Sequence, residues 1–349
     1  MVKSVALLMP ALNEETSAVE TLDSIFKSTR LPDEIIVADG GSTDKTREVV
    51  AKYQDRGVKL IIIDNPDVYA GAGRNYAFAA CNSDILMLMD FGNTVAPDWI
   101  EKMAVPFEQN PEMGFVSGAF IPDADSDFEH VVASILYHNN ALLDKIPIEK
   151  LMQQMPTDHS PGALSLAISR DMWIKVQGMP DWLRAAEDKL FGRKMMTFKP
   201  VYALLPEARI KHHMRSNLLD VFKQMQTYSR GNGRTRYLQK YLLKLLAIYI
   251  LPLIFIPFFP TKILLTAIVI GALMYFWKSG VSKVIKVDGK LRKHKFIFQS
   301  IGIVVARDLG VMWGTLLGLF DWHMKPQFKQ KYYQYIKDTS LINEPIIVD

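Results

Sequence analysis

The chain has 349 residues, of which 49% are hydrophobic and 22% charged, and its formal net charge is +4. This charge is too small to indicate a nucleic-acid partner, and the single cysteine, Cys81, excludes an intrachain disulfide and a cysteine-based metal site. The mean hydropathy of +0.06 is high for a soluble enzyme, so apolar residues must be concentrated in one part of the chain. The first apolar run, Val5–Met9, is too short for a signal peptide and predicts a buried strand.

Short apolar runs alternate with amphipathic stretches over residues 1–125. The runs predict strands, and the stretches with helical spacing predict the helices between them. This rhythm indicates an α/β domain with a mostly parallel, Rossmann-like sheet covered by helices. The expected strands are Val5–Met9, Glu34–Ala38, Lys59–Ile63 and Ile85–Met89, and the expected helices are Thr16–Lys27, Asp44–Tyr53 and Ala70–Cys81.

A polar or glycine-rich loop follows each of these four strands. Parallel sheets bind ligands at the carboxyl ends of their strands, where such loops meet. The sequence therefore predicts one shared pocket. Its loops are Pro10–Glu15, Asp39–Asp44, Asn65–Arg74 and Asp90–Thr94.

Residues 126–215 have a more mixed pattern. Leu164–Ile168 predicts a strand and Asp171–Gln177 a short helix, after a polar loop at Thr157–Gly162. Ala186–Met196 predicts a further helix, because acidic residues near its start suit a helix N-terminus.

The character of the chain changes after residue 240, and between Leu245 and Trp277 the only charged residue is Lys262. The apolar segments Tyr241–Phe259 and Thr261–Trp277 are near the lower limit of about 17–25 residues for a spanning helix. They predict a membrane hairpin, and a hairpin buried in the protein core is the alternative.

A third apolar stretch, Phe296–Phe320, carries Arg307 and Asp308 in its middle. Basic residues flank it on both sides, and basic segments stay in the cytoplasm. We therefore expect Phe296–Phe320 to be re-entrant or interfacial, with Arg307 and Asp308 paired or facing a polar site. Its glycines fall four apart on one helix face and permit close helix packing: Gly310, Gly314 and Gly318.

These patterns divide the chain into three parts. A cytoplasmic α/β domain is expected at residues 1–235, a membrane region at 236–325 and a cytoplasmic tail at 326–349. The membrane region would consist of the hairpin 241–277, a basic cytoplasmic loop 278–295 and the segment 296–320. The protein is therefore expected at the cell (inner) membrane.

Two glycine-containing turns precede predicted helices. Asp39-Gly40-Gly41-Ser42-Thr43-Asp44 places a carboxylate at a strand end, where it can accept a hydrogen bond from a base or sugar; an ordinary capped turn is the alternative. Gly71-Ala72-Gly73-Arg74-Asn75 brings Arg74 to a helix N-terminus, where a diphosphate can bind. This motif is not the dinucleotide fingerprint, because the third glycine is missing.

Carboxylates occur at two further places. Asp90 follows the fourth strand and is a candidate ligand for a divalent ion on a nucleotide diphosphate, or a turn residue. Glu187 and Asp188 lie at the start of a predicted helix, where a carboxylate can take the proton from an acceptor hydroxyl. Helix capping is the alternative for this pair.

Basic and histidine side chains form two groups later in the chain. His212 and His213 are placed to donate to a diphosphate or to ligate a metal, and a merely polar role is the alternative. Arg230 and Arg234 precede the first apolar segment and can bind either a substrate phosphate or anionic headgroups.

Taken in order, these motifs resemble glycosyltransferase family 2, whose catalytic domain has the GT-A fold. The resemblance covers roughly residues 3–235. Each motif is weak alone, but their order and spacing together are specific. The motifs are Pro10–Glu15, Asp39–Asp44, Gly71–Asn75, Asp90–Asn93 with Pro97-Asp98-Trp99 behind it, Ser160–Ala163 and Glu187-Asp188.

The resemblance implies an inverting transferase that moves a sugar from a nucleotide-diphosphate sugar. Asp188 would be its catalytic base, with Glu187 beside it. The residues implied in donor binding are Pro10, Ala11, Leu12, Glu14, Asp39, Arg74 and Asp90. Those expected to contact the acceptor or a phosphate are Gly162, His212, Arg230 and Arg234.

The sequence departs from the family pattern at the metal motif, where Gly92 and Asn93 replace further carboxylates. The implied ion, Mg²⁺ or Mn²⁺, would be bound by Asp90 with Asn93 or His213. Arg and Lys cations in place of the ion are the alternative.

Gln224–Gly231 lacks the Gln-x-x-Arg-Trp signature of the processive members that build cellulose, chitin or hyaluronan, so we expect single-sugar transfer. The membrane part suggests a lipid-linked acceptor, namely a polyprenyl-diphosphate-linked sugar or oligosaccharide in polysaccharide or glycoconjugate assembly. Two alternatives stay open: a polyprenyl-phosphate glycosyl synthase, and a catalytically inactive nucleotide-sugar-binding membrane subunit. The oligomeric state is open as well.

Overall fold

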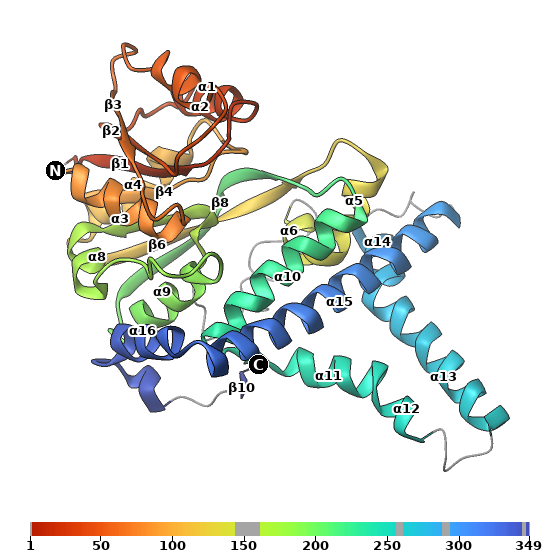
Figure 1. Cartoon of the computed structure of the whole chain (residues 1–349). Coiled ribbons are helices and arrows are strands. Elements are labelled where there is room, and N and C mark those ends of the chain that lie inside the picture. Colours follow the sequence, from red (N-terminus) through yellow and green to blue (C-terminus); the bar gives the residue numbers. More distant parts are fainter. Residues whose placement is uncertain (1, 144–160, 256–260, 288–293, 344–346, 349) are drawn as a thin grey trace. The chain divides into compact units, whose positions relative to one another are not determined.

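The computed structural model describes residues 2–143, 161–255, 261–287, 294–343 and 347–348 (Figure 1). The chain forms two compact units that we call the sheet unit and the helical unit. The sheet unit comprises Met1–Asp123, Lys145–His213 and Tyr335–Ile342, and the helical unit comprises Ala124–Asp144, Met214–Gln334 and Asn343–Asp349. Parts of four predicted segments lie outside the described residues: 157–160 of the polar loop, 256–259 of the first apolar segment, 288–293 of the basic segment, and 344–346 and 349 of the tail.

An eight-stranded mixed sheet forms the centre of the sheet unit. Its strands are β1 (Val5–Ala11), β2 (Glu34–Asp39), β3 (Lys59–Asp64), β4 (Ile85–Leu88), β5 (Asn93–Val95), β6 (Met113–Asp123), β7 (Leu166–Ser169) and β8 (Val201–His213). Their order is β3-β2-β1-β4-β7-β6-β8-β5. The first four pair in parallel, as predicted, whereas β7 and β5 run antiparallel to their neighbours. The carboxyl ends of β1, β2 and β4 therefore lie side by side.

Helices cover both faces of this sheet. Alternate strand residues point to opposite sides, and here both sets are apolar, so each face is buried against helices. Leu7 and Met9 of β1 belong to one buried cluster with residues of α1 and α4, and Leu8 belongs to the other, with residues of α3, α8 and α9. Burying each such side chain stabilises the fold by about 1.5–3 kcal/mol. The helices of this unit are α1 (Ala18–Phe26), α2 (Thr46–Ala51), α3 (Ala70–Ala80), α4 (Trp99–Gln109), α8 (Arg170–Val176) and α9 (Glu187–Met196), with a 3₁₀ turn η1 (Ala163–Ser165).

Most predicted elements of the sheet unit are present, with shorter ends. Helix α2 begins only at Thr46, because the Asp44 side chain accepts the Thr46 N–H (3.0 Å) ahead of the first turn. The strand expected from Leu164 begins at Leu166, after η1. Strands β5, β6 and β8 and helix α4 had no counterpart in the prediction. In β8, Ala208 and Ile210 alternate with charged residues in the period-two pattern of a half-buried strand.

The described part of the helical unit consists of helices and one pair of short strands (Figure 1). Its apolar core is built around Ile303 and Val304 of the longest helix. The remaining elements of the chain are α5 (Asp127–Leu136), α6 (His138–Ala141), α10 (Leu218–Arg234), α11 (Lys240–Tyr249), α12 (Leu251–Phe255), α13 (Thr261–Phe276), the π-helical turn η3 (Trp277–Val281), α14 (Ser282–Val287), α15 (His294–Met324), α16 (Pro326–Ile336), η4 (Ser340–Asn343), β9 (Leu238–Gln239) and β10 (Ile347–Val348).

Glycines let α10 and α15 pack side by side at very close range. A Cβ atom on Gly314 would lie 2.2 Å from the carbonyl oxygen of Gln226, and one on Gly318 would lie 2.3 Å from that of Arg230. Side chains do not tolerate such distances, so this contact requires glycine. The predicted close packing along the face of Gly310, Gly314 and Gly318 is confirmed.

Two helical stretches are long and apolar enough to cross a membrane, judged by length and composition: Leu265–Val287 and Lys295–Met324. In the most apolar part of each, 22% and 44% of the residues are buried within the structure. The first apolar segment of the predicted hairpin is instead divided between α11 and α12. Pro252, at the second residue of α12, has no N–H for a continuous helix.

Two details of the predicted membrane region are corrected. The segment 278–295 is not a loop in its first half, because η3 and α14 keep residues 278–287 helical. Their lysines do not interrupt a helix, since long side chains can carry the charge away from the apolar surface. Phe296–Phe320 lies within α15, a continuous helix of 31 residues, whereas a re-entrant segment would need a chain reversal. The other part of that expectation, an interfacial segment, stays a prediction.

Candidate active site

Side-chain hydrogen bonds join the loops that follow β1 and β2. The Asn13 N–H donates to Ser42 Oγ (2.9 Å), and Asn13 Oδ1 accepts the Thr43 N–H (2.9 Å). The Glu15 carboxylate accepts the N–H of Lys45 (2.7 Å). Asn13 has a φ of 57°, in the left-handed region that asparagine tolerates. The two predicted ligand loops therefore form one continuous rim.

Asp39, expected to read the nucleotide base, ends β2 and is 2% exposed. The Ser42 hydroxyl donates to its Oδ1 (2.5 Å), and Arg47 Nη1 donates to its Oδ2 (3.0 Å). Arg47 also reaches Asp64 at the end of β3 (2.7 Å). The Asp39 side chain is therefore buried and fixed by hydrogen bonds to Ser42 and Arg47.

Arg74 is the centre of the predicted site. It is 1% exposed on α3, and its guanidinium donates to Asp90, after β4, and lies 3.4 Å from Glu187 at the start of α9. Burial opposes the charge, but the two carboxylates outweigh it and raise the pKa of Arg74 above its usual value. Residues from three distant parts of the sequence therefore meet at one side chain.

The two glycines before Arg74 allow α3 to approach its neighbours. A Cβ on Gly71 would lie 2.7 Å from the carbonyl oxygen of Pro180, and one on Gly73 would lie 2.9 Å from Asn65 Nδ2. The Gly-x-Gly motif therefore serves helix packing, and this packing brings Arg74 to the strand ends.

Glu187 and Asp188 follow Ala186, whose φ of 65° is left-handed and costs of order 1–3 kcal/mol for a residue with a side chain. Burial and the neighbouring Asp188 raise the pKa of Glu187 to about 7, although Arg74 acts in the opposite direction. Asp188 Oδ2 accepts the N–H of Ala163 (3.3 Å). It also faces Gly162, where a Cβ would lie 3.4 Å away, so the predicted acceptor residue is beside the predicted base.

Glu14 adds a further carboxylate to this cluster. Its carboxylate accepts the Ser17 hydroxyl, and burial, together with the charges of Asp90 and Asp44, raises its pKa. The charge of Asp90 acts on both Glu14 and Glu187, and the charge of Asp188 acts on Glu187. Arg74 and Lys189 are cations that interact with this group. Burial therefore disfavours the ionised form of two carboxylates in this cluster, Glu14 and Glu187.

The predicted metal set of Asp90, Asn93 and His213 is not brought together. Pairing of β5 with β8 places Asn93 opposite His212, and Asn93 Oδ1 shares a hydrogen bond of 2.7 Å with His212 Nδ1. Asn93 Nδ2 donates to the Asp90 carbonyl oxygen (3.0 Å). His213 is the next residue of the same strand, so its side chain points to the opposite face.

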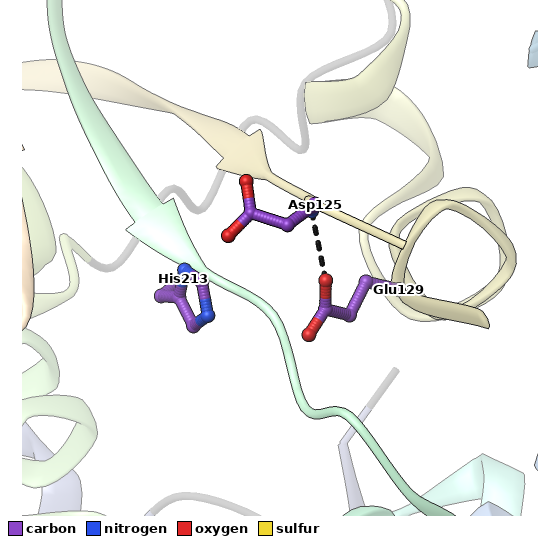
Figure 2. A group of neighbouring side chains, drawn as sticks. All are labelled: Asp125, Glu129 and His213. Carbon is purple, nitrogen blue, oxygen red and sulfur yellow. Dashed lines mark hydrogen bonds between the residues drawn. The ribbon is translucent and has the colours of Figure 1, made fainter. Parts of the chain in front are cut away.

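His213 ends β8, where it pairs in register with Asp123 of β6. Figure 2 draws His213 with Asp125 and Glu129 of the helical unit, where the Glu129 carboxylate accepts the N–H of Asp125 (2.8 Å). Glu129 also accepts the N–H of Ser126 (2.9 Å) and donates its own N–H to Ser126 Oγ, which completes a capping box for α5. Glu129 therefore has a clear role in helix capping.

Arg230 and Arg234, expected at an acceptor or phosphate, have a carboxylate partner in the helical unit. Their Nε atoms lie 2.7 and 2.8 Å from Asp321 Oδ2, and Lys325 Nζ lies 2.9 Å from Oδ1. Asp321 is 1% exposed on α15. This ion cluster joins α10 to α15, since residues four apart lie on the same helix face.

One element of the site was not predicted, the loop of residues 177–180. Asn75 clamps it by donating to the Met179 carbonyl oxygen (2.8 Å) and accepting the Met179 N–H (2.9 Å). Gly178 and Pro180 are the local turn signals in the sequence. Nothing local, however, indicates a partner more than 100 residues away.

Comparison with known proteins agrees with this geometry. Residues 6–167 match the model of glycosyl transferase family 2. O-antigen chain rhamnosyltransferase RfbN of Salmonella typhimurium is 26% identical over 211 residues, which cover 60% of this chain and 66% of that protein. Glucosyl-dolichyl phosphate glucuronosyltransferase of Haloferax volcanii is 24% identical over 120 residues, 34% of this chain and 38% of that protein. The chain thus spans less than two thirds of the first relative and well under half of the second.

A solved structure supports the fold. Mannosyltransferase PcManGT from Pyrobaculum calidifontis, in complex with GDP-Man and Mn²⁺, superposes with a TM-score of 0.54 at 14% identity, covering 92% of this chain and 88% of that one. The expected GT-A fold, followed by C-terminal helices, is confirmed. Residues 6–167 of this chain match the family model, and the sheet unit has the GT-A architecture. These residues therefore form a glycosyltransferase family 2 domain.

Proposed function

We propose that this protein is an inverting glycosyltransferase that moves one sugar from a nucleotide-diphosphate sugar to an acceptor hydroxyl. The observation that carries the proposal is the cluster in which Asp90 and Glu187 meet at Arg74, with Glu14 and Asp188 near them. Such a convergence at strand ends suits a charged donor and a proton-transfer step. The family 2 domain at residues 6–167 supports it.

Asp188 is the general base in this proposal. Its two oxygens accept the N–H groups of Lys189 (2.7 Å) and Ala163 (3.3 Å), and each oxygen keeps a further lone pair for an acceptor hydroxyl. Glu187 sits beside it with a pKa of about 7, because its burial and the neighbouring charge of Asp188 both disfavour the ionised form. The acceptor oxygen bonds to the anomeric carbon as its proton passes to Asp188. The bond from that carbon to the diphosphate breaks on the opposite face, which inverts the configuration.

The donor would lie along the rim of the β1 and β2 loops. Leu12 is exposed there, and Ala11 lies at the end of β1 beside Asp39 of β2 in the register. We place the nucleotide base at Pro10–Leu12 and Asp39, and the diphosphate near Arg74 and Glu14. The Arg74 guanidinium would then exchange part of its pairing with carboxylates for pairing with the diphosphate.

A divalent cation fits the oxygen ligands that the site offers. Carboxylates supply the hard oxygen ligands that Mg²⁺ and Mn²⁺ prefer, and the Asp90 side chain is 36% exposed. Asp90 would hold the ion, while the Asn93 oxygen already shares a hydrogen bond with His212. Such an ion would supply positive charge to the leaving diphosphate.

The acceptor in this proposal is a polyprenyl-diphosphate-linked sugar or oligosaccharide at the inner face of the cell membrane, used in polysaccharide or glycoconjugate assembly. Two apolar helices of sufficient length support membrane attachment. The names of two relatives support parts of this proposal: one is an O-antigen chain rhamnosyltransferase, which acts in polysaccharide assembly, and the other, a glucosyl-dolichyl phosphate glucuronosyltransferase, is named for a lipid-linked sugar.

A donor screen tests the proposal. The purified protein is melted with UDP- and GDP-sugars, each with Mn²⁺ and with EDTA, because ligand at about 100 times its Kd stabilises the folded state by about 2.7 kcal/mol. The donor that raises the melting temperature is then incubated with a polyprenyl-diphosphate-linked sugar and, separately, with a polyprenyl phosphate. Extension of the lipid-linked sugar, detected by mass, is the expected result. Failure of every donor to bind and to react would overturn the proposal.

A further inference from the structure

The C-terminal segment Tyr335–Ile342 belongs to the sheet unit, although it had been expected in a simple tail. The Tyr335 hydroxyl donates to the carbonyl oxygen of Gly178 (2.7 Å). The Tyr335 ring lies 4.0 Å from Lys194 Nζ, and this ammonium also donates to Gln177 Oε1 (3.1 Å). Tyr335 and Lys194 therefore hold the same short loop, residues 177–180.

This loop packs against the residues at the centre of the site. Asn75 bonds to both backbone groups of Met179, and Arg74 Nη1 lies 3.8 Å from Met179 Sδ. Gly178 has a φ of 71°, and a Cβ there would lie 2.5 Å from Asn75 Oδ1. A displacement of the loop would therefore move Arg74 and Asn75 directly.

Lys194 links the same contact to α9. It lies seven residues after Glu187, two turns along the helix, so the two side chains leave the same face. Lys194 is 2% exposed, and its burial lowers its pKa to about 8 while Asp338 acts in the opposite direction. An ammonium that is expensive to bury yet contacts an aromatic ring and an amide suggests a positional role rather than a stabilising one.

The arrangement of Arg74 makes such support necessary. Its Nε atom is buried without a hydrogen-bond partner among the described residues, so its placement depends on Asp90, Glu187 and Met179. Ala186, directly before Glu187, is in a strained left-handed conformation. The positions of Arg74 and of Glu187 therefore both depend on contacts with neighbouring residues.

We propose that Tyr335 and Lys194 are positioning residues, which hold the 177–180 loop and α9 so that Arg74, Asp90 and Glu187 keep the geometry needed for sugar transfer. This inference rests on the proposed transferase function. Neither residue contacts substrate in this proposal; both act through Gly178, Met179 and α9. The C-terminal segment is thus part of the site's support.

The test uses the full-length protein with four substitutions. Tyr335→Phe removes only the hydroxyl that binds Gly178, and Tyr333→Phe is the matched control on the same helix. Lys194→Met removes the charge at similar length, and Lys194→Arg keeps a cation that can stack on the Tyr335 ring. The kcat and the donor KM are measured for each, with the melting temperature and the amide hydrogen exchange of residues 71–76 and 177–180.

We expect Tyr335→Phe and Lys194→Met to lower kcat about 3- to 10-fold, the range for loss of a buried hydrogen bond, with a smaller change in donor KM. Lys194→Met should melt at or above the wild-type temperature, because it removes a buried charge, and Lys194→Arg should recover most of the kcat. Exchange of the two segments should accelerate in Tyr335→Phe and not in Tyr333→Phe. A merely structural role would instead lower melting temperature and kcat together.

Wild-type kcat in both variants, or unchanged exchange in Tyr335→Phe, would overturn the inference. The exchange measurement needs no substrate, so it separates the two proposals. If the wild-type protein turns over no nucleotide sugar but exchange still depends on Tyr335, the transferase proposal fails and the support by Tyr335 stands. If the wild-type protein is active and neither kcat nor exchange responds, the positioning inference alone fails.

Discussion

The two units use carboxylates in opposite ways. In the helical unit Asp308 is fully buried and accepts the hydroxyls of Tyr241 (2.6 Å), Tyr275 (2.6 Å) and Tyr249 (3.0 Å), together with Arg307 Nε (2.8 Å). The pairing of Arg307 with Asp308 was expected and is confirmed. Each oxygen of Asp308 has two donors, so this carboxylate joins α11, α13 and α15 and has no capacity left for a ligand.

In the sheet unit the carboxylates of the candidate site have, among the described residues, fewer hydrogen-bond donors than Asp308 has. Asp90 is partly exposed, and burial raises the pKa of both Glu14 and Glu187, so these carboxylates are not fully stabilised by charged partners. An incompletely neutralised cluster costs stability that a cationic or proton-donating ligand can recover. The comparison teaches that saturation, rather than burial alone, separates a structural carboxylate from one available for chemistry.

The largest expected effect is on the proposed base. Asp188→Asn removes the proton acceptor with little change in shape, so turnover should fall about 10²- to 10⁴-fold while the donor still raises the melting temperature. Steady-state kinetics and thermal shift measure the two responses. Asp55→Asn, at an exposed site in the turn before β3, is the control and should behave as wild type. Turnover by Asp188→Asn at the wild-type rate would show that another group is the base.

The second prediction contrasts a saturated carboxylate with an unsaturated one. Asp321→Ala takes the shared carboxylate from Arg234, whose side chain is mostly buried, and from Arg230, which is partly exposed, so we expect a loss of about 1.5–3 kcal/mol in the free energy of unfolding. Asp90→Ala should cost less, because Arg74 keeps Glu187 as a partner. Chemical denaturation of the two purified variants and the wild type, all in one detergent, measures both losses in the free energy of unfolding. Equal losses would contradict the comparison between the units.

The third prediction concerns pH. The folded pKa of Glu187 is about 7, against an ordinary value of 4.5, so between these pH values the folded state binds more protons than the unfolded state. Glu187 should therefore make the wild-type protein progressively less stable as pH rises from 4.5 to 7. In Glu187→Gln this contribution is absent.

Unfolding of both proteins across this pH range tests the idea. The stability of Glu187→Gln relative to wild type should increase with pH, by up to about 3 kcal/mol, and should level off above pH 7. A difference that stays constant across the range would mean that Glu187 ionises normally.

The smallest expected effect concerns helix packing in the helical unit. Gly314→Ala would place a Cβ 2.2 Å from the Gln226 carbonyl oxygen, so α10 and α15 must separate, at a cost of about 1–3 kcal/mol. Gly271→Ala is the matched control on α13, where nothing lies within 4 Å of the added atom. It should be neutral or raise the melting temperature, because alanine favours helix by about 0.8–1 kcal/mol. A neutral Gly314→Ala would show that this contact is not tight.

Much of the sheet unit was predictable, because its signals are local. Buried parallel strands are continuous apolar runs such as Val5–Met9, and the helices between them follow the helical period. The three-residue strand β5 and the bridging strand β8 have weaker signals, since β8 is half exposed along much of its length. The position of His213 was hard to predict for a related reason: without the β5–β8 register, nothing shows which of two adjacent histidines faces Asn93.

The amino-acid sequence by itself determined the kinds of element, the rim loops, the glycine face of α15 and the identities of the charged residues Arg74, Asp90, Glu187 and Asp188. These depend on neighbours within a few residues along the chain. Only the tertiary structure decided which charges meet, that Arg230 and Arg234 pair with Asp321, and that Tyr335 returns to support the 177–180 loop. Such pairings join residues tens to more than 100 positions apart, and their energy exists only once the backbone has brought them together.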